Sequence, residues 1–257
     1  MSERPLEGKV AIVTGSSRGI GRGIAVAYGA AGANVVLAAR TMSDLDSVAD
    51  EVRAAGGGAH VVHMDAYDYR EVESVIDQGV AHFGRLDILV NNAGGSRNVD
   101  DGWKGFLDSS VETVDEVFKM HVSSPYAAAR RAAQQMIEQG FGGSIINITS
   151  ALGHYPSTTV QNYSASKVTL LEMTKLWAVE LGPHQIRVNS IGPGITRSAT
   201  TEKLFADPQA EHAASLTVPL RRLGEPSDIA GAAVFLASDA AEWISGASII
   251  IAGGQRF

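Results

Sequence analysis

The sequence predicts a doubly wound α/β fold, in which one parallel sheet carries helices on both faces. Seven apolar runs rich in β-branched residues recur along the chain, and they are near-continuous, as is typical of strands buried on both faces. Segments with a helical period separate these runs, and repeated strand–helix alternation favours right-handed crossovers. The predicted strands are Val10–Thr14, Asn34–Ala39, His60–Met64, Leu86–Asn91, Ser144–Ile148, Arg187–Ile191 and Ser248–Ile251.

The intervening helices are recognised by an apolar face. Such a face is formed by Ile20, Ile24, Ala27, Tyr28 and Ala31 in the first helix, and by Leu170, Thr174, Trp177 and Leu181 in a later one. Two long apolar helices are expected over 113–139 and 162–181. No linker, charge block or repeat divides the chain, which indicates a single domain over residues 1–257.

Composition excludes several classes of function. The 257 residues are 45% hydrophobic and 19% charged, as in an ordinary globular protein, and the net charge of −7 offers no general attraction to nucleic acid or an anionic membrane. The absence of Cys excludes disulfides, Cys-based zinc sites and thiol catalysis, and we expect no metal site. The charged N-terminus and the lack of a membrane-spanning run predict a cytoplasmic protein.

One long segment, about residues 195–226, interrupts the alternation after the sixth strand. Ligands bind beyond the carboxyl ends of the strands in open α/β folds, so an insertion there is expected to act as a substrate lid. The alternative is a packed helical excursion without a function.

A glycine-rich turn, Thr14–Gly21, follows the first strand with the pattern G-x-x-x-G-x-G. Glycines let the backbone turn tightly and approach a ligand closely. The helix that begins here offers free N–H groups and a favourable dipole, so the turn predicts a pyrophosphate site.

Two arginines indicate which dinucleotide is bound. A site for NAD usually carries an acidic residue at the end of the second strand, but Ala39 stands there and Arg40 follows it. Arg18 lies in the glycine turn. Because two guanidiniums suit a 2′-phosphate by charge and geometry, the sequence favours NADP(H). The alternative is that both arginines are solvated surface residues.

A Tyr-x-x-x-Lys pair opens the helix after the fifth strand. The spacing puts Tyr163 and Lys167 on one face, where an ammonium stabilises phenolate and brings the high pKa of a tyrosine toward useful values. Ser150 ends the fifth strand, and its hydroxyl could bind the same substrate oxygen. Alone, such a pair is a weak signal, since this spacing arises by chance in many helices.

Taken together, these residues closely resemble the short-chain dehydrogenase/reductase family over nearly the whole chain. The motifs in common are Thr14–Gly21, Asn91–Gly94, Ser150, Tyr163 with Lys167, Pro193–Gly194 and Gly253–Gly254. The resemblance implies a Rossmann-like sheet of order 3-2-1-4-5-6-7. It also implies hydride transfer between nicotinamide C4 and a carbonyl or alcohol carbon, in a homo-oligomer for which a tetramer is expected.

The resemblance also implies roles for single residues. Tyr163 would be the acid/base, Lys167 would hold the nicotinamide ribose and lower the pKa of Tyr163, and Ser150 would position the substrate oxygen. The implied cofactor contacts are Gly15, Ser17, Arg18, Gly19, Ile20, Gly21, Arg40, Asp65, Ala66, Asn92, Ala93, Gly94, Tyr163, Lys167, Pro193, Gly194, Ile195 and Thr196.

His121 is the one departure from the family pattern. The family usually has an Asn in this helix, where it helps to hold a water that connects the Lys to solvent. His121 can bind water too, and an unperturbed imidazole titrates near pH 6.5. We therefore include His121 in the site as a replacement for the relay residue, the alternatives being a relay through a backbone carbonyl or a packed histidine with no chemical role.

The expected substrate is a medium-sized, partly apolar ketone or aldehyde. Candidate pocket walls are the lid and residues Gly95, Ser96, Arg97, His154 and Tyr155, while Trp103 and Phe106 could line the pocket or pack on the sheet edge. Reduction of 3-oxoacyl groups on an acyl carrier protein is the second candidate. Arg130 and Arg131 are its possible docking points, but the negative net charge opposes an acidic partner. A non-catalytic NADP-binding regulator and a structural assembly protein remain as alternatives.

Overall fold

The computed structural model describes residues 4–95, 105–155, 157, 159–198, 201 and 206–255. They contain a seven-stranded sheet in the order β3-β2-β1-β4-β5-β6-β7, with every pairing parallel, which confirms the predicted fold class and strand order. Each strand ends within two residues of its predicted bounds. The strands are β1 Val10–Thr14, β2 Asn34–Ala39, β3 Ala59–His63, β4 Ile88–Asn91, β5 Gly143–Ile148, β6 Ile186–Pro193 and β7 Ser248–Ile251.

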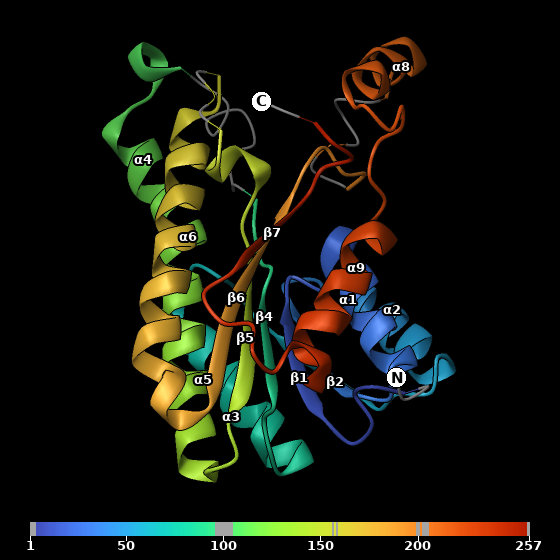
Figure 1. Ribbon diagram of the computed structural model, residues 1–257, viewed down its shortest axis with the longest axis vertical. Coiled ribbons are helices and arrows are strands. Elements are labelled where there is room, and N and C mark those ends of the chain that lie inside the picture. The colour runs from blue at the N-terminus through green and yellow to red at the C-terminus, as the bar shows by residue number, and fades with distance from the viewer. Residues whose placement is uncertain are drawn as a thin grey trace.

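Helices cover both faces of the sheet (Figure 1). One face carries α1 (Gly19–Ala30), α2 (Met42–Ala54) and α9 (Pro226–Ala237). The other carries α3 (Tyr69–Phe83), α4 (Val111–Phe118), α5 (Ser124–Gln139) and α6 (Gln161–Leu181). A further helix, α8 (Pro208–Thr217), lies beyond the sheet above α9 and α1.

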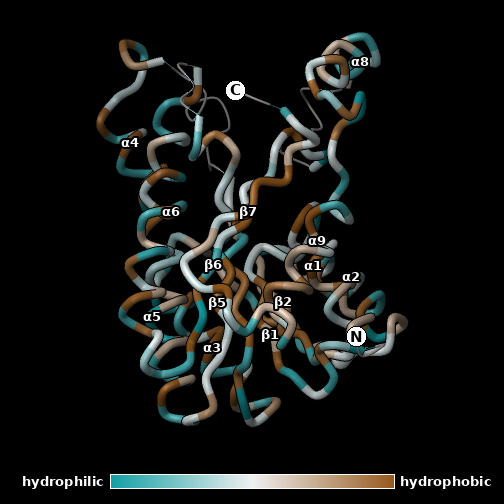
Figure 2. Tube along the Cα trace, viewed as in Figure 1, coloured by the Kyte–Doolittle hydropathy of each residue, from teal (hydrophilic) through white to brown (hydrophobic). Residues whose placement is uncertain are grey.

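Each layer of helices closes its own hydrophobic core against the sheet. Side chains alternate between the faces of a strand, so Ala11 and Val13 of β1 enter the core beneath α1, α2 and α9, whereas Ile12 enters the core beneath α3 and α5. Figure 2 shows the hydrophobic residues gathered along the central strands. Burial on both faces explains why the strands are near-continuous apolar runs in the sequence.

The helix predicted over 113–139 is interrupted. A π-helical turn, Lys119–Ser123, separates α4 from α5 and buries Met120, His121 and Val122. Pro125 has no N–H to donate to the carbonyl of His121, four residues earlier, so the α-helical pattern fails at this point. The N–H of Ser124 bonds instead to the carbonyl of Lys119, five residues back. The prediction of one continuous helix was therefore wrong.

Among the described residues, no helix is long and apolar enough to cross a membrane.

Candidate active site

The glycine turn after β1 takes a backbone conformation that requires glycine. Gly15 and Gly19 have φ of +66° and +57°, in the left-handed region. A Cβ on Gly15 would lie 2.7 Å from the Cα of Ala93, and a Cβ on Gly21 would lie 2.4 Å from the carbonyl oxygen of Gly15. The turn is therefore packed directly against the loop that follows β4.

Hydrogen bonds to β2 and to the loop after β4 hold this turn in place. Ser16 is buried, and its Oγ accepts a hydrogen bond of 3.0 Å from the N–H of Ala38 in β2. The Nδ2 of Asn92 donates to the carbonyl oxygens of Thr14 and Gly15, at 2.9 and 3.0 Å. Asn92, predicted to lie beside the cofactor, thus also braces the turn.

The N-terminus of α1 fits an anionic group. No side chain caps it, and its first turn contains no acidic residue, whereas α3 is capped by the carboxylate of Asp68. The first N–H groups of a helix have no partner within the helix, and the dipole favours negative charge there. Together with the glycine cradle, these N–H groups fit the pyrophosphate of a dinucleotide.

Arg18 and Arg40 follow the carboxyl ends of adjacent strands. β1 pairs with β2 in register, and Arg18 lies in the turn after β1 while Arg40 comes directly after β2. Both side chains are on the surface, and neither has an ion-pair partner within the described part of the chain. Ala39, where a carboxylate would select a 2′-hydroxyl, is buried.

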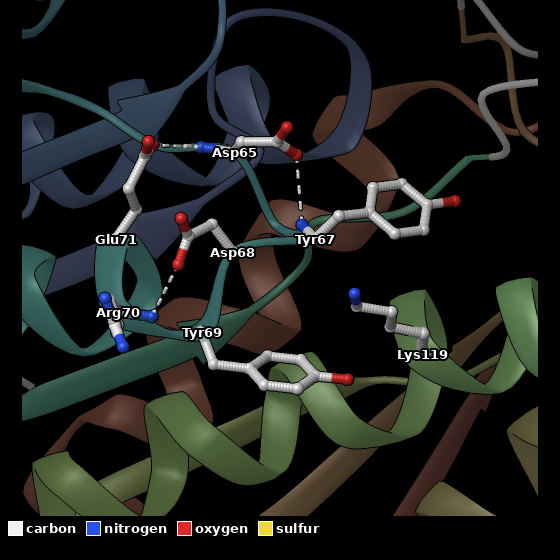
Figure 3. A pocket seen from close by; sticks show the side chains of 7 residues that line it. All are labelled: Asp65, Tyr67, Asp68, Tyr69, Arg70, Glu71 and Lys119. Carbon is white, nitrogen blue, oxygen red and sulfur yellow. Dashed lines mark hydrogen bonds between the residues drawn. The ribbon is translucent and has the colours of Figure 1, made fainter.

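Asp65 follows β3, and Ala66 beside it is buried. The N–H of Asp65 donates to Oε2 of Glu71 at 2.8 Å, and its Oδ1 accepts from the N–H of Tyr67 at 3.0 Å. Figure 3 shows these contacts at the rim of an open pocket of about 500 Å³. The pocket is lined by Asp65, Tyr67, Asp68, Tyr69, Arg70, Glu71 and Lys119.

The predicted Ser–Tyr–Lys group is brought together at the carboxyl edge of the sheet. Ser150 lies two residues beyond β5, and Tyr163 lies in the first turn of α6. The Ser150 and Tyr163 side chains are hydrogen-bonded. The Nζ of Lys167 lies 5.6 Å from the centre of the Tyr163 ring and donates a 3.0 Å hydrogen bond to the carbonyl oxygen of Ile148.

Burial dominates the protonation of this group. It lowers the pKa of Lys167 from its ordinary 10.5 to about 8. Burial also raises the pKa of Tyr163 above its ordinary value, and the hydrogen bond with Ser150 opposes that rise. The sequence predicted a lowered tyrosine pKa, and in the protein alone this prediction was wrong because burial outweighs the hydrogen bond with Ser150.

His121 lies in the same cluster. Its side chain, in the π-helical turn, is only 4% exposed, and its ring packs edge-on against Tyr163 with 5.2 Å between centroids. A Cβ on Gly94 would lie 3.3 Å from Cε1 of the imidazole. Its Nδ1 is buried and has no hydrogen-bond partner among the described residues.

The imidazole is neutral at physiological pH. Burial, together with the charge of Lys167, lowers the pKa of His121 well below 6.5. The expectation that His121 titrates near pH 6.5 was therefore wrong, because it assumed a hydrated side chain.

The segment after β6 is tied to β7 and to the glycine turn. The N–H of Gly194 donates to the carbonyl of Ile251 at 2.9 Å, and Thr196 pairs with Gly224. A Cβ on Gly19 would lie 3.3 Å from the Cβ of Ser198. Ser198 thus adjoins the expected pyrophosphate site, although the sequence analysis ended this segment at Thr196; only the three-dimensional contact reveals it.

Only some of the pocket walls predicted from the sequence lie among the described residues. Ser96, Arg97 and Trp103 lie outside the described residues. Nε2 of His154 is 3.0 Å from Oγ of Ser248 in β7, so this side chain is engaged with the sheet. Phe106 lies in a short 3₁₀ turn and is largely exposed, which contradicts both the extended loop and the packing on the sheet edge considered for it.

The predicted docking arginines are paired with acids. Arg130 contacts Glu73 at 3.4 Å, and Arg131 contacts Asp77 at 2.7 Å, both across to α3. These ion pairs leave the two guanidiniums less available to an acidic carrier than the sequence alone indicated.

Comparison with known proteins identifies the family. Residues 15–256 match the family model described as enoyl-(acyl carrier protein) reductase. An uncharacterized oxidoreductase of Mycobacterium tuberculosis is 38% identical, over 98% of this chain and 94% of its own. A short-chain type dehydrogenase/reductase from Mycobacterium marinum superposes with a TM-score of 0.89 at 38% identity, covering 98% and 97% of the two chains.

A second solved structure is a 7α-hydroxysteroid dehydrogenase in complex with NADH and 7-oxo glycochenodeoxycholic acid. It has a TM-score of 0.91 at 34% identity and covers 98% of this chain and 96% of its own. These similarities extend over nearly the whole chain. The chain belongs to the short-chain dehydrogenase/reductase family of oxidoreductases.

Proposed function

We propose that the protein is an NADP(H)-dependent oxidoreductase that interconverts a carbonyl and a secondary alcohol on a medium-sized, partly apolar substrate. The observation that carries this proposal is the convergence of Ser150, Tyr163 and Lys167 at the carboxyl edge of the sheet. A pure binding protein has no need of a proton donor at this place, which counts against a non-catalytic regulator.

The proposed chemistry divides between cofactor and protein. The nicotinamide, when bound, supplies or accepts the hydride at C4. Ser150 donates a hydrogen bond to the substrate oxygen and orients it toward Tyr163. The phenol of Tyr163 gives its proton to that oxygen during reduction and takes it back during oxidation. Lys167 holds positive charge beside the phenol, which stabilises the phenolate left behind.

Binding of the cofactor is expected to change the acid–base properties of this group. The pKa of Tyr163 is raised by burial in the protein alone. Lys167 would hold the ribose of a bound cofactor, and the positive charge of an oxidised nicotinamide nearby would favour phenolate. The phenol therefore approaches a useful pKa only in the loaded site.

For His121 we propose a positioning role. A buried Nδ1 without a partner costs free energy unless an ordered water satisfies it. Such a water, held between the neutral imidazole and Lys167, would return the proton to the lysine. His121 would then act through Lys167 without changing its own charge.

The choice of NADP(H) rests on Arg18 and Arg40. Both follow the carboxyl ends of the adjacent strands β1 and β2, which supports a 2′-phosphate site there, and neither has an ion-pair partner within the part of the chain that the structure describes. A hydrogen bond between charged groups contributes about 1.5–3 kcal/mol, so each arginine is expected to favour NADPH over NADH by roughly 10- to 150-fold.

We also propose that the protein assembles with copies of itself, with a tetramer as the expected state. Large apolar side chains are exposed on two sides of the chain, and an assembly would cover them. They are Tyr126, Val168, Leu176 and Val179 on α5 and α6, and Phe235 on α9, Ile250 in β7 and Trp243 between these two elements. Light scattering after size-exclusion chromatography measures the mass directly.

Oxidation of NADPH in the presence of a panel of ketones and aldehydes tests the proposed activity. Tyr163→Phe keeps the ring and the fold, and loss of the proton donor is expected to lower the rate about 10²- to 10⁴-fold. NADPH binding by this variant serves as the control. Turnover within a few-fold of wild type would remove Tyr163 from the mechanism.

The cofactor choice is tested separately. Arg18→Ala, Arg40→Ala and the double variant should each weaken NADPH binding while leaving NADH binding nearly unchanged. An unchanged preference in the double variant, or a wild-type preference for NADH, would overturn the assignment.

A further inference from the structure

A chain of buried hydrogen bonds joins the end of β4 to the helix that carries Tyr163 and Lys167. Nδ2 of Asn91 donates to Oδ1 of Asn147 at 2.9 Å, and Nδ2 of Asn147 donates to Oγ1 of Thr174 at 2.9 Å. Thr174 in turn donates to the carbonyl of Leu170 at 2.8 Å, within α6. Asn147 and Thr174 are both completely buried.

The direction of these bonds is fixed by their chemistry. The hydroxyl of Thr174 has a single hydrogen, which the carbonyl of Leu170 receives, so its oxygen can only accept from Asn147. The amide of Asn147 must therefore turn its NH₂ toward Thr174 and its oxygen toward Asn91. Reversing the Asn147 amide would bring two donors together at Asn91 and leave Thr174 without its donor.

This network lies directly beneath the Lys167 contact. Asn147 precedes Ile148, whose carbonyl oxygen accepts the hydrogen bond from Nζ of Lys167. Thr174 stands seven residues after Lys167, or two helical turns along the same inward face. The hydrogen bond between Asn147 and Thr174 thus connects β5 to α6 immediately beside the place where the Lys167 side chain reaches from the helix to the strand.

We propose that Asn147 and Thr174 are positioning residues, which fix the register of α6 against β5 so that Lys167 reaches the Ile148 carbonyl and stays aligned with Tyr163. The proposal rests on the proposed function, since it assigns Lys167 a part in the reaction. Neither residue is assigned a contact with the substrate or the cofactor, and both act through Lys167.

Thr174→Val tests this role because valine keeps the shape of threonine and removes the hydroxyl, which accepts from Asn147 and donates to the carbonyl of Leu170. The NH₂ of Asn147 is then buried without its partner, and α6 is expected to loosen against β5. We expect kcat for carbonyl reduction to fall about 10- to 100-fold, since small misplacements near a reacting group cost that much, with KM little changed.

A second readout does not depend on turnover. Burial holds the pKa of Lys167 near 8, and the titratable groups that face it are Tyr163 on its own helix and His121 on the π-helical turn. Loosening admits water, so in Thr174→Val the pKa of Lys167 should rise by about half a unit or more. NMR of ¹⁵N-labelled lysine follows this titration, with the signal assigned by Lys167→Arg.

Two variants serve as controls. Thr174→Ser keeps the hydroxyl and should restore both kcat and the titration midpoint. Ser144 lies near the amino end of β5, the strand that contains Asn147. Ser144→Ala removes the buried hydrogen bond from its hydroxyl to the carbonyl of Leu236. It should lower thermal stability yet leave kcat and the Lys167 midpoint at wild-type values. Thr174→Cys, whose thiol is only a weak acceptor, replaces Thr174→Val if the latter does not fold.

The outcomes separate the two proposals. A folded Thr174→Val with wild-type kcat and an unmoved Lys167 midpoint overturns the positioning role, as does an equal shift in Ser144→Ala. Full turnover by Tyr163→Phe would instead overturn the proposed function, and the lysine titration would still decide whether the register is held by Thr174.

Discussion

The two helices α6 and α8 both follow strands that end at the ligand-binding edge, yet they are held in opposite ways. α6 buries six residues, and two of them, Lys167 and Thr174, are hydrogen-bonded to β5. α8 buries none, and an ion pair between Glu211 and Arg197 ties it to the segment after β6.

The difference follows from what each region has to do. Groups that exchange protons need fixed distances, and buried hydrogen bonds supply them because breaking one leaves an unsatisfied polar atom. A lid needs low barriers to opening, and exposed ion pairs contribute little stability and yield to salt. The contacts of α8 thus suit a lid, which stays a prediction for residues 195–226.

Lys167→Met is expected to cause the largest loss of activity and, at the same time, a gain in stability. Loss of the ammonium beside Tyr163 should lower kcat about 10²- to 10⁴-fold and weaken cofactor binding. The variant should nevertheless melt at a higher temperature, because it no longer buries a charge. Steady-state kinetics and thermal unfolding measure the two changes.

The stability gain should depend on pH. The pKa of Lys167 is about 8 in the folded protein and near 10.5 when unfolded, so between these values the unfolded state binds the extra proton. The loss of folding stability caused by burying the charged Lys167 is therefore at its full size below pH 8 and becomes smaller as the pH rises toward 10.5. The difference in melting temperature should shrink over that window, and a constant difference would contradict the assignment.

Variants at His121 should have intermediate effects. His121→Leu leaves a proposed water short of one partner, which is expected to slow turnover about 2- to 12-fold, whereas His121→Asn should stay close to wild type. Because the imidazole is neutral, rate profiles over pH 6–9 should keep their shape in both variants. Loss of an ionisation below pH 7 in His121→Asn would show that His121 titrates after all.

The smallest effect is expected in α8. Glu211→Gln removes the carboxylate that pairs with Arg197, and an exposed pair contributes about 0.2–1 kcal/mol, so KM for the substrate should rise by no more than roughly fivefold. Raising the salt concentration should reproduce the effect in wild type. Glu172→Gln, which breaks an exposed pair with Lys175 on α6, is the matched control and should leave KM unchanged.

The strands could be predicted closely because burial on both faces leaves a direct mark on composition. Val35, Val36, Leu37 and Ala38 are all buried, and the sequence there shows an unbroken apolar run. The glycine turn and the Tyr–Lys pair were readable for a similar reason, since local spacing alone places their residues. The interruption at Lys119–Ser123 had a signal too, in Pro125 within the predicted helix.

The rest of the candidate site depends on contacts between distant segments. Nothing in the local sequence says that Ser198 lies against Gly19, or that the Ile148 carbonyl receives Lys167. The protonation states of Tyr163 and His121 were misjudged because burial, which dominates both, is a property of the folded chain.

The π-helical turn has a consequence for comparing this chain with its relatives. An α-helix turns by about 100° per residue. One residue added or removed between Val111 and Pro125 therefore rotates the helical residues that precede the change by that angle relative to α5. His121 faces Tyr163 only in the present helical phase. A relative can therefore carry the same residue at the aligned position and yet point it elsewhere, and the spacing to Pro125 has to be counted along with the side chain.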